Sequence, residues 1–528
     1  MKKFFAVILS VILIIGILPL GVVADSNDDW KEYLVEELRE VETGTIDVSK
    51  YNVTFDEVLT FLNYDIYYSY PEISYYFYWI ENAKYKYNSE YAGTFNFIYY
   101  YDVEDIKVMQ NQVEEIVDSV LKNVDNEWND LQKALYIHDW LCQHYMYDLR
   151  LYDENEYEYI NSDLYSFITE GRGVCQAYAF TYMYLLRRCS IESRYVVSDE
   201  ANHGWNIVNI DGKWYHIDVT HDDPIANYDG DTDFLGLTAH DHFLLSDSQL
   251  QETCVMHINW YEPLSEVYSD MDYSAVDTCE EYKGNAYWKG IKTPFINVEK
   301  DWYYVDYNMG GLVKTRDFTD KQRIVEIGCE YDGKYYWMLE DGSGVPAYFV
   351  GLYEMNGHIF FNDNLNVYSY DTHFGKLNTV CSLDEKGKDR IYGMSINGNT
   401  IDYITDIDCE MEGLLEHFYQ LGNHLFISDW FVTKEATDTD DGEQVKMCYI
   451  CGEVVERQII PALGADENYG DADGDGEVTT KDLAVMKLFL VGGGTGGLSE
   501  LADVNRDGAV DTKDLATLKL FLAGAVKL

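Results

Sequence analysis

Apolar residues recur at helical spacing along much of the first third of the chain. In residues 102–124 they fall close to the 3.6-residue period of one helix face, at Ile106, Met109, Val113, Ile116, Val117 and Val120. The same criterion predicts helices at residues 28–41, 49–64 and 131–145 and over the apolar run 177–186. The tyrosine-rich stretch 75–101 predicts two or three strands. The N-terminal part is therefore expected to combine helices with a small sheet.

A hairpin pattern follows the apolar run. Residues 205–210 alternate like a strand, Asp211-Gly212 is a two-residue turn signal, and residues 214–219 form the returning strand. Antiparallel pairing about this turn would place Asp218 opposite Trp205, close to His203.

Residues 285–435 have a different pattern, in which short aromatic strands alternate with turn signals. The strands are expected at 302–305, 334–338, 358–361, 367–370, 400–404 and 424–427. The strongest hairpin signals are Asp332-Gly333, Asn356-Gly357 and Asn397-Gly398. This spacing predicts an all-β domain, either a sandwich or a few propeller-like blades, that serves binding or spacing rather than chemistry.

One cysteine, one histidine and one aspartate have settings that suit catalysis. Cys175 follows Gly171, Arg172 and Gly173 and should lie in the first turn of the helix, where unpaired N–H groups lower a thiol pKa. His203 follows 28 residues later and Asp218 a further 15. The hairpin would supply a base and a carboxylate that orients it.

The motifs GVCQAYA, NHGWN and HIDVTHDDP, in this order, resemble the transglutaminase-like superfamily, with its papain-type Cys-His-Asp triad. The resemblance spans about residues 125–260. It implies an α+β, papain/transglutaminase-like core, in which the helix carrying the cysteine packs on an antiparallel sheet. It also implies that Cys175, His203 and Asp218 are catalytic. The leader, residues 25–125, resembles the N-terminal region of clostridial transglutaminase-like proteins and is expected to pack on the core and shape substrate access.

Other interpretations of these residues remain open. A cysteine before an apolar helix is commonly a small buried hydrophobe. His216 and His221 flank Asp218 and could form a metal site with Asp222 and Asp223. Two further histidines, His240 and His242, are expected to be structural, with satisfied hydrogen bonds.

Composition restricts the setting of the protein. The formal net charge of −56 argues against nucleic acid and anionic membranes as partners and favours cation binding. Residues 1–24 read as a secretory signal peptide, with Lys2-Lys3, an apolar core and a Val22-Val23-Ala24 cleavage pattern. An uncleaved membrane anchor is the alternative. With cleavage, the chain is expected outside the cytoplasm and not in a membrane. The ten cysteines are scattered and do not resemble a disulfide scaffold.

Residues 436–467 are expected to be a linker that carries a spacer. It includes Cys448 and Cys451, a C-x-x-C pair that could be half of a zinc site or a small disulfide loop. The structural role is favoured because no second pair lies nearby.

The C-terminal tail contains two calcium-loop motifs, 32 residues apart. Oxygen ligands at positions 1, 3, 5, 9 and 12, a backbone carbonyl at 7 and glycine at 6 are the pattern of an EF-hand loop. The first copy offers Asp471, Asp473, Asp475, Glu477, Thr479 and Asp482. The second offers Asp503, Asn505, Asp507, Ala509, Asp511 and Asp514. Each loop precedes a helix, at residues 483–491 and 515–522, so two Ca²⁺ ions are expected.

Aspartate replaces the usual glutamate at position 12, and two such loop–helix repeats resemble a type I dockerin, a small α-helical module spanning residues 468–528. The resemblance implies a cohesin partner on a scaffolding protein. It therefore implies an extracellular, cellulosome-type complex of the kind that serves polysaccharide degradation. It also assigns the cohesin contacts to positions 10 and 11, which are Thr480, Lys481, Thr512 and Lys513. Their identity in both repeats suggests docking in two orientations.

Together these patterns predict a sequence of regions along the chain. They are a signal peptide (1–24), leader (25–125), catalytic domain (126–275), all-β domain (285–435), linker (436–467) and dockerin (468–528). The expected function is cleavage or transfer at protein or peptide amide bonds by a secreted cysteine enzyme that needs no cofactor for catalysis. A non-catalytic protein that binds cell-wall or plant polymers is the alternative, and an amidase of glycan–peptide links is a third possibility.

Overall fold

The computed structural model divides the 528-residue chain into two compact units, residues 1–421 and 422–528. Each unit is described by itself. The structure describes residues 29–81, 91–152, 161–223, 237–253, 257, 260–263, 290–306, 308–327, 329–331, 334–338, 344–346, 350–355, 357–383, 389–397, 400–407, 415–420, 428, 430–437, 440–448, 454–462, 468–492 and 497–526. The predicted signal peptide lies outside these residues.

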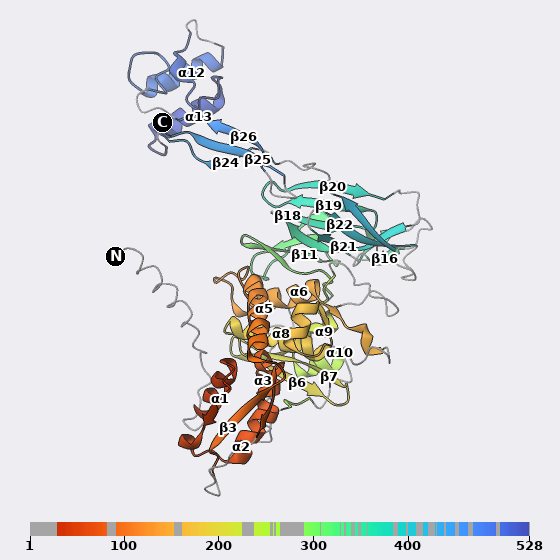
Figure 1. The fold of residues 1–528 in the computed structure, drawn as a ribbon. Coiled ribbons are helices and arrows are strands. Elements are labelled where there is room, and N and C mark those ends of the chain that lie inside the picture. Colours follow the sequence, from red (N-terminus) through yellow and green to blue (C-terminus); the bar gives the residue numbers. More distant parts are fainter. Residues whose placement is uncertain are drawn as a thin grey trace, which may run out of the picture. The chain divides into compact units, whose positions relative to one another are not determined.

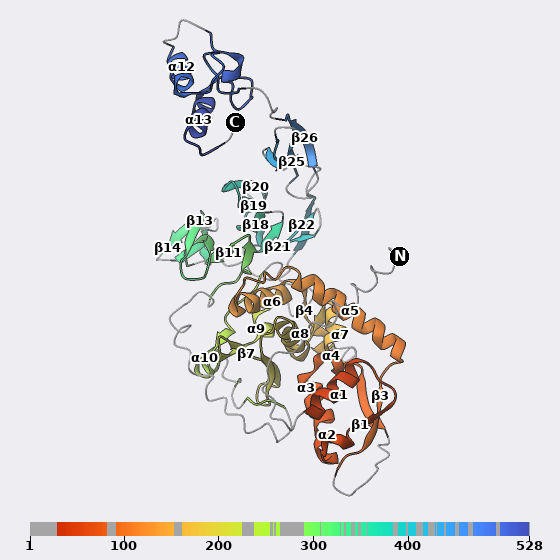
Figure 2. The ribbon, with the colours of Figure 1, turned by 90° about the vertical axis from the view of Figure 1, so that its left-hand side faces the viewer.

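The leader combines a small sheet with several helices (Figures 1 and 2). Its strands, in the antiparallel order β1-β3-β2, are β1 Thr45–Asp47, β2 Phe77–Glu81 and β3 Thr94–Tyr99. Its helices are α1 Asp29–Arg39, α2 Phe55–Thr60, α3 Ile66–Ser69, α4 Pro71–Ser74 and α5 Val103–Leu121. The expected helix at 49–64 is instead a 3₁₀ turn, Ser49–Tyr51, then α2 and a π-helical turn, Phe61–Asp65. A new helix starts at Phe55 because Thr54 and Glu57 form a capping box.

The following core packs helices against a four-stranded antiparallel sheet, in the order β6-β7-β8-β9. The strands are β6 Ser193–Ser198, β7 His203–Ile210, β8 Lys213–Ile217 and β9 Phe243–Leu245. The helices are α6 Asp130–His144, α7 Leu164–Glu170, α8 Cys175–Arg188, α9 Val219–Asp222 and α10 Asp247–Thr253. A short parallel pair, β4 Met146–Tyr147 and β5 Arg172–Gly173, precedes α8. The expected mixture of helices and sheet is confirmed for this region.

The predicted β7–β8 hairpin is confirmed. Asn206 pairs with Ile217 and Ile210 with Lys213. Asp211 and Gly212 have φ angles of 52° and 79°, as a type I′ turn requires. Asp218 therefore follows the last paired residue of β8, at the end of the hairpin where His203 begins β7.

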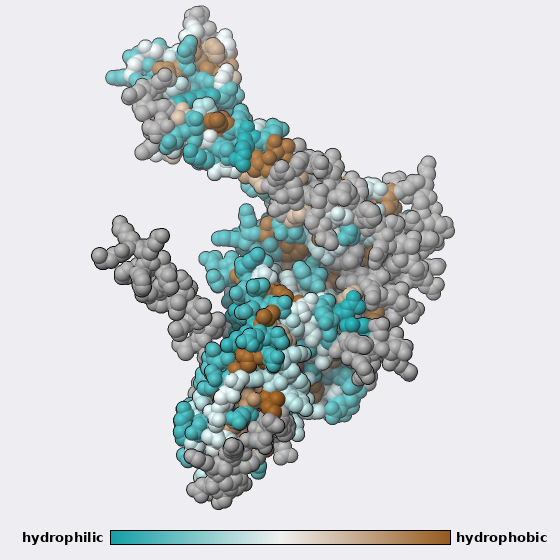
Figure 3. Space-filling view, in the orientation of Figure 1, coloured by the Kyte–Doolittle hydropathy of each residue, from teal (hydrophilic) through white to brown (hydrophobic). Residues whose placement is uncertain are grey.

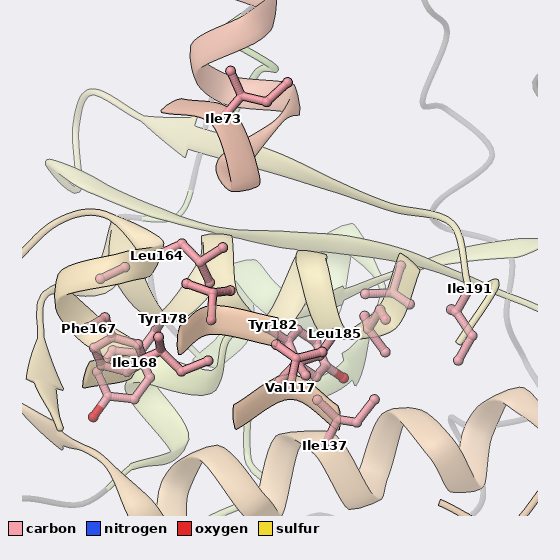
Figure 4. Close-up of a cluster of buried hydrophobic side chains, with 14 of the residues drawn as sticks. Ile73, Val117, Ile137, Leu164, Phe167, Ile168, Tyr178, Tyr182, Leu185 and Ile191 are labelled. Atoms are coloured by element: carbon pink, nitrogen blue, oxygen red, sulfur yellow. The ribbon is translucent and has the colours of Figure 1, made fainter. Parts of the chain in front are cut away.

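One continuous hydrophobic cluster joins the leader to this core. Figure 4 shows Ile73 of the leader above side chains from α5, α6, α7 and α8, including Val117, Ile137, Leu164 and Tyr178. All five are fully buried. Because burial of apolar surface is the main favourable term in folding, the leader and the core are expected to stabilise one another.

The rest of unit 1 is built from antiparallel sheets whose neighbouring strands are consecutive in sequence. The sheets are β10 Ile296–Val298, β11 Asp301–Asp306, β12 Gly311–Thr315 and β13 Gln322–Glu326; β14 Cys329–Tyr331, β15 Lys334–Met338 and β16 Gly344–Pro346; β17 Leu352–Met355, β18 His358–Asn362, β19 Asn366–Asp371 and β20 Lys376–Ser382; and β21 Asp389–Asn397, β22 Thr400–Ile407 and β23 Leu415–Gln420. Of the two expected arrangements, this meander order favours the blade-like one. The expected strand at 424–427 lies outside the described residues.

The two faces of β11 have different packing partners. Trp302 and Tyr304 belong to the cluster of the helical core, and Trp302 lies 4.8 Å from Trp128 between ring centroids. Tyr303 and Val305 alternate with them and join a second cluster with Leu352 of β17. The first sheet is therefore packed between the core and the sheet β17–β20.

Unit 2 begins with a three-stranded sheet, β24 Phe431–Lys434, β25 Gly442–Met447 and β26 Val454–Ile460. This sheet spans the expected boundary at residue 435 and occupies much of the expected linker. Cys448 is buried, and Cys451 lies outside the described residues. Two helices follow, α12 Thr480–Leu490 and α13 Thr512–Leu522, around a small apolar cluster that includes Met486 and Leu518.

Among the coloured residues in Figure 3, hydrophilic ones are frequent, with small hydrophobic patches between them. In the part of the chain that the structure describes, no helix is long and apolar enough to cross a membrane. Among the described residues, the free thiols include Cys175, Cys189 and Cys381.

Candidate active site and calcium loops

Cys175 is the first residue of α8, as predicted, and its thiol is free and only partly exposed. The preceding turn is held in place by Asn161, whose backbone oxygen accepts the N–H of Val174 at 3.0 Å. Gly173 permits this turn, because a Cβ there would lie 2.5 Å from Phe167 Cδ2 and 2.9 Å from Ala177 Cβ. The helix start offers its unpaired N–H groups beside the sulfur.

His203 and Asp218 meet at the end of the hairpin. The Nε2 atom of His203 lies 2.7 Å from Oδ2 of Asp218. Asp218 is fully buried and caps α9, where its Oδ1 accepts the backbone N–H of His221 at 3.2 Å. The carboxylate is therefore fixed relative to the imidazole from two directions.

The thiol and the imidazole are electrostatically coupled. Burial raises the pKa of Cys175, but a hydrogen bond with His203 and the positive charge of its ring outweigh burial, so the net shift is downward. Burial lowers the pKa of His203, but the charge and hydrogen bond of Asp218, together with Cys175, raise it to about 10. The pKa of Asp218 lies well below its usual value because two imidazoles outweigh the cost of its burial. The arrangement favours a thiolate–imidazolium pair at neutral pH.

Two further histidines surround Asp218. His221 Nδ1 lies 2.6 Å and His257 Nε2 lies 3.1 Å from the same Oδ2 atom. His221 was considered from the sequence only as part of a metal site with His216, Asp222 and Asp223. His257 was not predicted, since it follows Asp218 by 39 residues and belongs to no motif.

The alternative metal site is not assembled as the sequence suggested. His216 Nε2 lies 2.7 Å from Asp247 Oδ1, and its Nδ1 accepts the indole N–H of Trp205 at 3.0 Å. Asp222 instead faces His138 and His242. Among the described residues, the four side chains therefore do not converge on one point.

A buried network of histidines and carboxylates lies behind the site. His138 lies 2.7 Å from Asp139 and 3.3 Å from Asp222. Burial lowers the pKa of His138, but these two carboxylates raise it to about 9. His240 contacts Asp139 at 2.9 Å, and His242 contacts Asp222 at 3.2 Å. Both have hydrogen-bond partners, in line with the structural role expected for them.

The leader reaches the start of α8. Gln176 donates through Nε2 to Tyr67 Oη and to the backbone oxygen of Ser162, each at 3.0 Å. The ring of Tyr68 stacks on that of Tyr195, with centroids 5.9 Å apart. The leader thus places Tyr67 next to Gln176, the residue that follows Cys175.

The first calcium-loop motif forms a compact carboxylate group. Single oxygens of Asp471, Asp473 and Asp482 lie within 4.8 Å of one another. Asp471 accepts the N–H groups of Gly474 and Gly476, each at 2.8 Å, and Gly476 at position 6 has a φ of 90°. Oxygen ligands on a tightly turned loop fit Ca²⁺. Asp475, Glu477 and Thr479 lie outside this group of described residues, and the Thr479 side chain caps α12.

The second motif repeats the backbone hydrogen bonds of the first. Asp503 accepts the N–H of Gly508 at 2.7 Å, and the buried Asp514 accepts the N–H of Asn505 at 2.9 Å. Asp511 caps α13 as Thr479 caps α12. Ala509 has no side-chain oxygen, so only its backbone carbonyl could contribute a ligand.

The residues expected to contact cohesin, Thr480, Lys481, Thr512 and Lys513, begin these two helices and are exposed. The two lysines have equivalent surroundings. Lys481 Nζ lies 3.3 Å from Asp475, and Lys513 Nζ lies 3.6 Å from Asp507.

Comparison with known families gives two matches. Residues 117–219 match the transglutaminase-like superfamily, and residues 469–523 match the dockerin type I domain. No protein of the curated set matches the chain significantly.

Three solved structures are similar over part of the chain. A protein assigned as a cysteine protease from Cytophaga hutchinsonii is 25% identical over 23% of this chain and 43% of its own, with a TM-score of 0.17. A TGase is 14% identical over 27% of this chain and 43% of its own, with a TM-score of 0.20. The N-terminal domain of Nup159 is 12% identical over 34% of this chain and 46% of its own, with a TM-score of 0.14. The chain thus spans less than half of each.

Proposed function

Because the chain contains a transglutaminase-like core and a type I dockerin domain, we propose that it is a secreted cysteine enzyme that acts on amide bonds of proteins or peptides and docks to a cohesin. The observation that carries this proposal is the position of Cys175 at the start of α8 together with the His203–Asp218 pair at 2.7 Å.

The chemistry follows from the three side chains. The Cys175 thiolate attacks the carbonyl carbon of a glutamine carboxamide or a peptide bond, and backbone N–H groups at the start of α8 stabilise the developing oxyanion. The His203 imidazolium protonates the leaving amine, and an acyl-enzyme remains. Asp218 orients the imidazole and supports its positive charge.

The second half of the reaction depends on the acceptor. Neutral His203 takes a proton from an incoming amine or water, which attacks the thioester and restores the thiolate. An amine gives transamidation, and water gives hydrolysis. The three side chains serve both outcomes equally, so the choice of acceptor depends on the shape of the site around them and on how far that site excludes water.

Docking is the second part of the proposal. We propose that the two loops bind one Ca²⁺ each, through the side-chain oxygens at positions 1, 3 and 12, of which all but the Asn505 amide are carboxylates. Bound Ca²⁺ neutralises these carboxylates and holds the starts of α12 and α13. Those helix starts then present Thr480 and Lys481, or Thr512 and Lys513, to a cohesin. The equivalent surroundings of Lys481 and Lys513 support docking in two orientations.

The decisive experiment measures Cys175 alkylation by iodoacetamide against pH, read by peptide mass in the mature chain. Cys189 serves as an internal control, because burial raises the pKa of its thiol. The proposal predicts a rate plateau for Cys175 well below pH 7 that His203→Ala removes. Slow labelling that rises only near pH ~8.5, the range of an ordinary thiol, and is indifferent to His203 would leave a cohesin-docked binding protein. With the plateau established, a glutamine-containing protein offered with and without an amine would distinguish transfer from hydrolysis.

A further inference from the structure

Three imidazole nitrogens converge on one carboxylate oxygen of Asp218. His203 Nε2, His221 Nδ1 and His257 Nε2 lie 2.7, 2.6 and 3.1 Å from Oδ2. The four ligand atoms lie within 4.8 Å of one another. The proposed catalysis uses only His203 and Asp218, so it leaves His221 and His257 unexplained.

Hydrogen bonds alone do not satisfy all three imidazole nitrogens at this one carboxylate oxygen. An ionised carboxylate oxygen has two lone pairs, but three nitrogens face it. In addition, His203 Nε2 and His221 Nδ1 lie 3.2 Å from one another. If both nitrogens carry protons, the two N–H groups point into the same small space. If either lacks its proton, a nitrogen lone pair faces the carboxylate. A cation at the centre would accept every lone pair at once.

We propose that His203, Asp218, His221 and His257 form a binding site for a divalent transition-metal ion, and that Zn²⁺ fits it best. Three imidazoles and one carboxylate are ligands that Zn²⁺ takes in tetrahedral geometry, with bonds of about 2.0–2.2 Å. The ligand atoms of such a tetrahedron lie about 3.3 Å apart, so the nitrogens and the oxygen need to separate by less than about 1 Å. Mg²⁺ and Ca²⁺ prefer sites made only of oxygen.

The surroundings suit a site that exchanges its ion with solvent. Asp218 and His257 are each 1% exposed, whereas the side chain of His221 is 39% exposed and provides the route of entry. The ring of Trp205 lies 4.7 Å from that of His257 and 5.8 Å from that of His203, which limits their rotation. Within the described residues, the four-ligand group does not include Cys175, so this site differs from capture of zinc by the thiol.

Binding would affect the reaction through His203. A metal ion on Nε2 replaces the proton that His203 shares with Asp218, so the imidazolium cannot form and the leaving amine is not protonated. Zinc would therefore inhibit turnover reversibly. This consequence rests on the proposed function, whereas the binding itself does not.

The test titrates the mature chain with Zn²⁺ in competition with a chromophoric zinc indicator. Excess Ca²⁺ occupies the dockerin loops, and a Cys448→Ser background removes the C-x-x-C pair. One Zn²⁺ per chain is expected. His221→Asn should weaken its affinity at least about tenfold, because one ligand is lost. His373→Asn, the same change at an exposed histidine on the β19–β20 turn, should leave it unchanged.

Two further variants sharpen the test. Cys175→Ser should retain zinc affinity, and weakening there would assign the ion to the thiol and overturn the proposal. His257→Ala should weaken binding as His221→Asn does, provided that its unfolding transition is intact. Absence of zinc binding, or affinity unchanged in His221→Asn, would also overturn it. A failed proposed function is distinguishable, since it would leave zinc binding intact while Cys175 alkylation showed no low-pH plateau.

Discussion

The Nε2 atom of His203 lies 2.7 Å from Oδ2 of Asp218, at the start of one hairpin strand and just past the end of the other. A second histidine of the hairpin, His216 of β8, lies at the same 2.7 Å distance from Asp247, the first residue of α10. Only the first pair has Cys175 as a hydrogen-bond partner of its histidine. The two pairs therefore provide a matched comparison between a proposed catalytic dyad and a structural one.

Asp218→Asn should reduce kcat/KM by about a hundredfold or more, because the imidazolium loses its compensating charge and its orientation. The pKa of His203 should fall, so the low-pH plateau of Cys175 alkylation should move upward. Asp247→Asn is the control and should leave the alkylation profile of Cys175 unchanged. Equal profiles in both variants would contradict the assignment of Asp218.

Gly204→Ala should destabilise unit 1 by about 1–3 kcal/mol through overpacking. A Cβ at Gly204 would lie 2.1 Å from the hydroxyl of Tyr195, which is buried against Tyr68 and Phe180. Urea unfolding measures the change. Gly44→Ala is the control, because nothing lies within 4 Å of its added Cβ, and its effect should stay within about 0.5 kcal/mol.

Stability should fall as the pH rises from neutral through about 9, in part because of His138. Its folded-state pKa of about 9 exceeds the ordinary value of 6.5. The stability that His138 contributes is therefore fully present below pH 6.5 and is lost as the pH rises through about 9. It amounts to at most about 1.4 kcal/mol for each unit by which folding raises the pKa. Unfolding free energies measured at about pH 6, 8 and 10, which run from below the ordinary pKa to above the folded-state pKa, test the sign. His138→Gln should show a smaller fall, and an equal fall would remove His138 as the cause.

Removal of calcium by a chelator should abolish cohesin binding and loosen residues 468–526. The clustered carboxylates of Asp471, Asp473 and Asp482 would then repel one another without a counter-charge. Calorimetry of the full chain should show loss of one low-enthalpy transition while that of the core persists. Asp482→Ala should act on the first loop alone. Cohesin binding that survives the chelator would refute a calcium requirement.

Replacement of Thr480 and Lys481 together by alanine should weaken cohesin binding by only about twofold, since one of two equivalent orientations is lost. The matched pair at Thr512 and Lys513 should behave alike, and the quadruple variant should lose binding. Titration calorimetry measures all three. Abolition of binding by the first pair alone would show a single docking mode.

Local signals in the sequence anticipated much of the site. Cys175 in the first turn of α8 and the hairpin register around Asp211-Gly212 depend on a few adjacent residues, and both predictions are confirmed. The calcium-loop motifs depend equally on short spacing, and the structure places Asp471, Asp473 and Asp482 together. Helix starts, turns and ligand loops can be predicted from the sequence because they depend on residues that are neighbours in the chain.

The sequence by itself determined the helix that presents Cys175, the hairpin that pairs His203 with Asp218, and the two loop–helix repeats. Tertiary structure alone decided that His257 joins His221 at Asp218, that Asp222 turns to His138, and that a three-stranded sheet occupies much of the expected linker. These contacts join residues far apart in the chain or on different elements. They arise from packing of whole elements against one another, which periodicity and spacing do not encode.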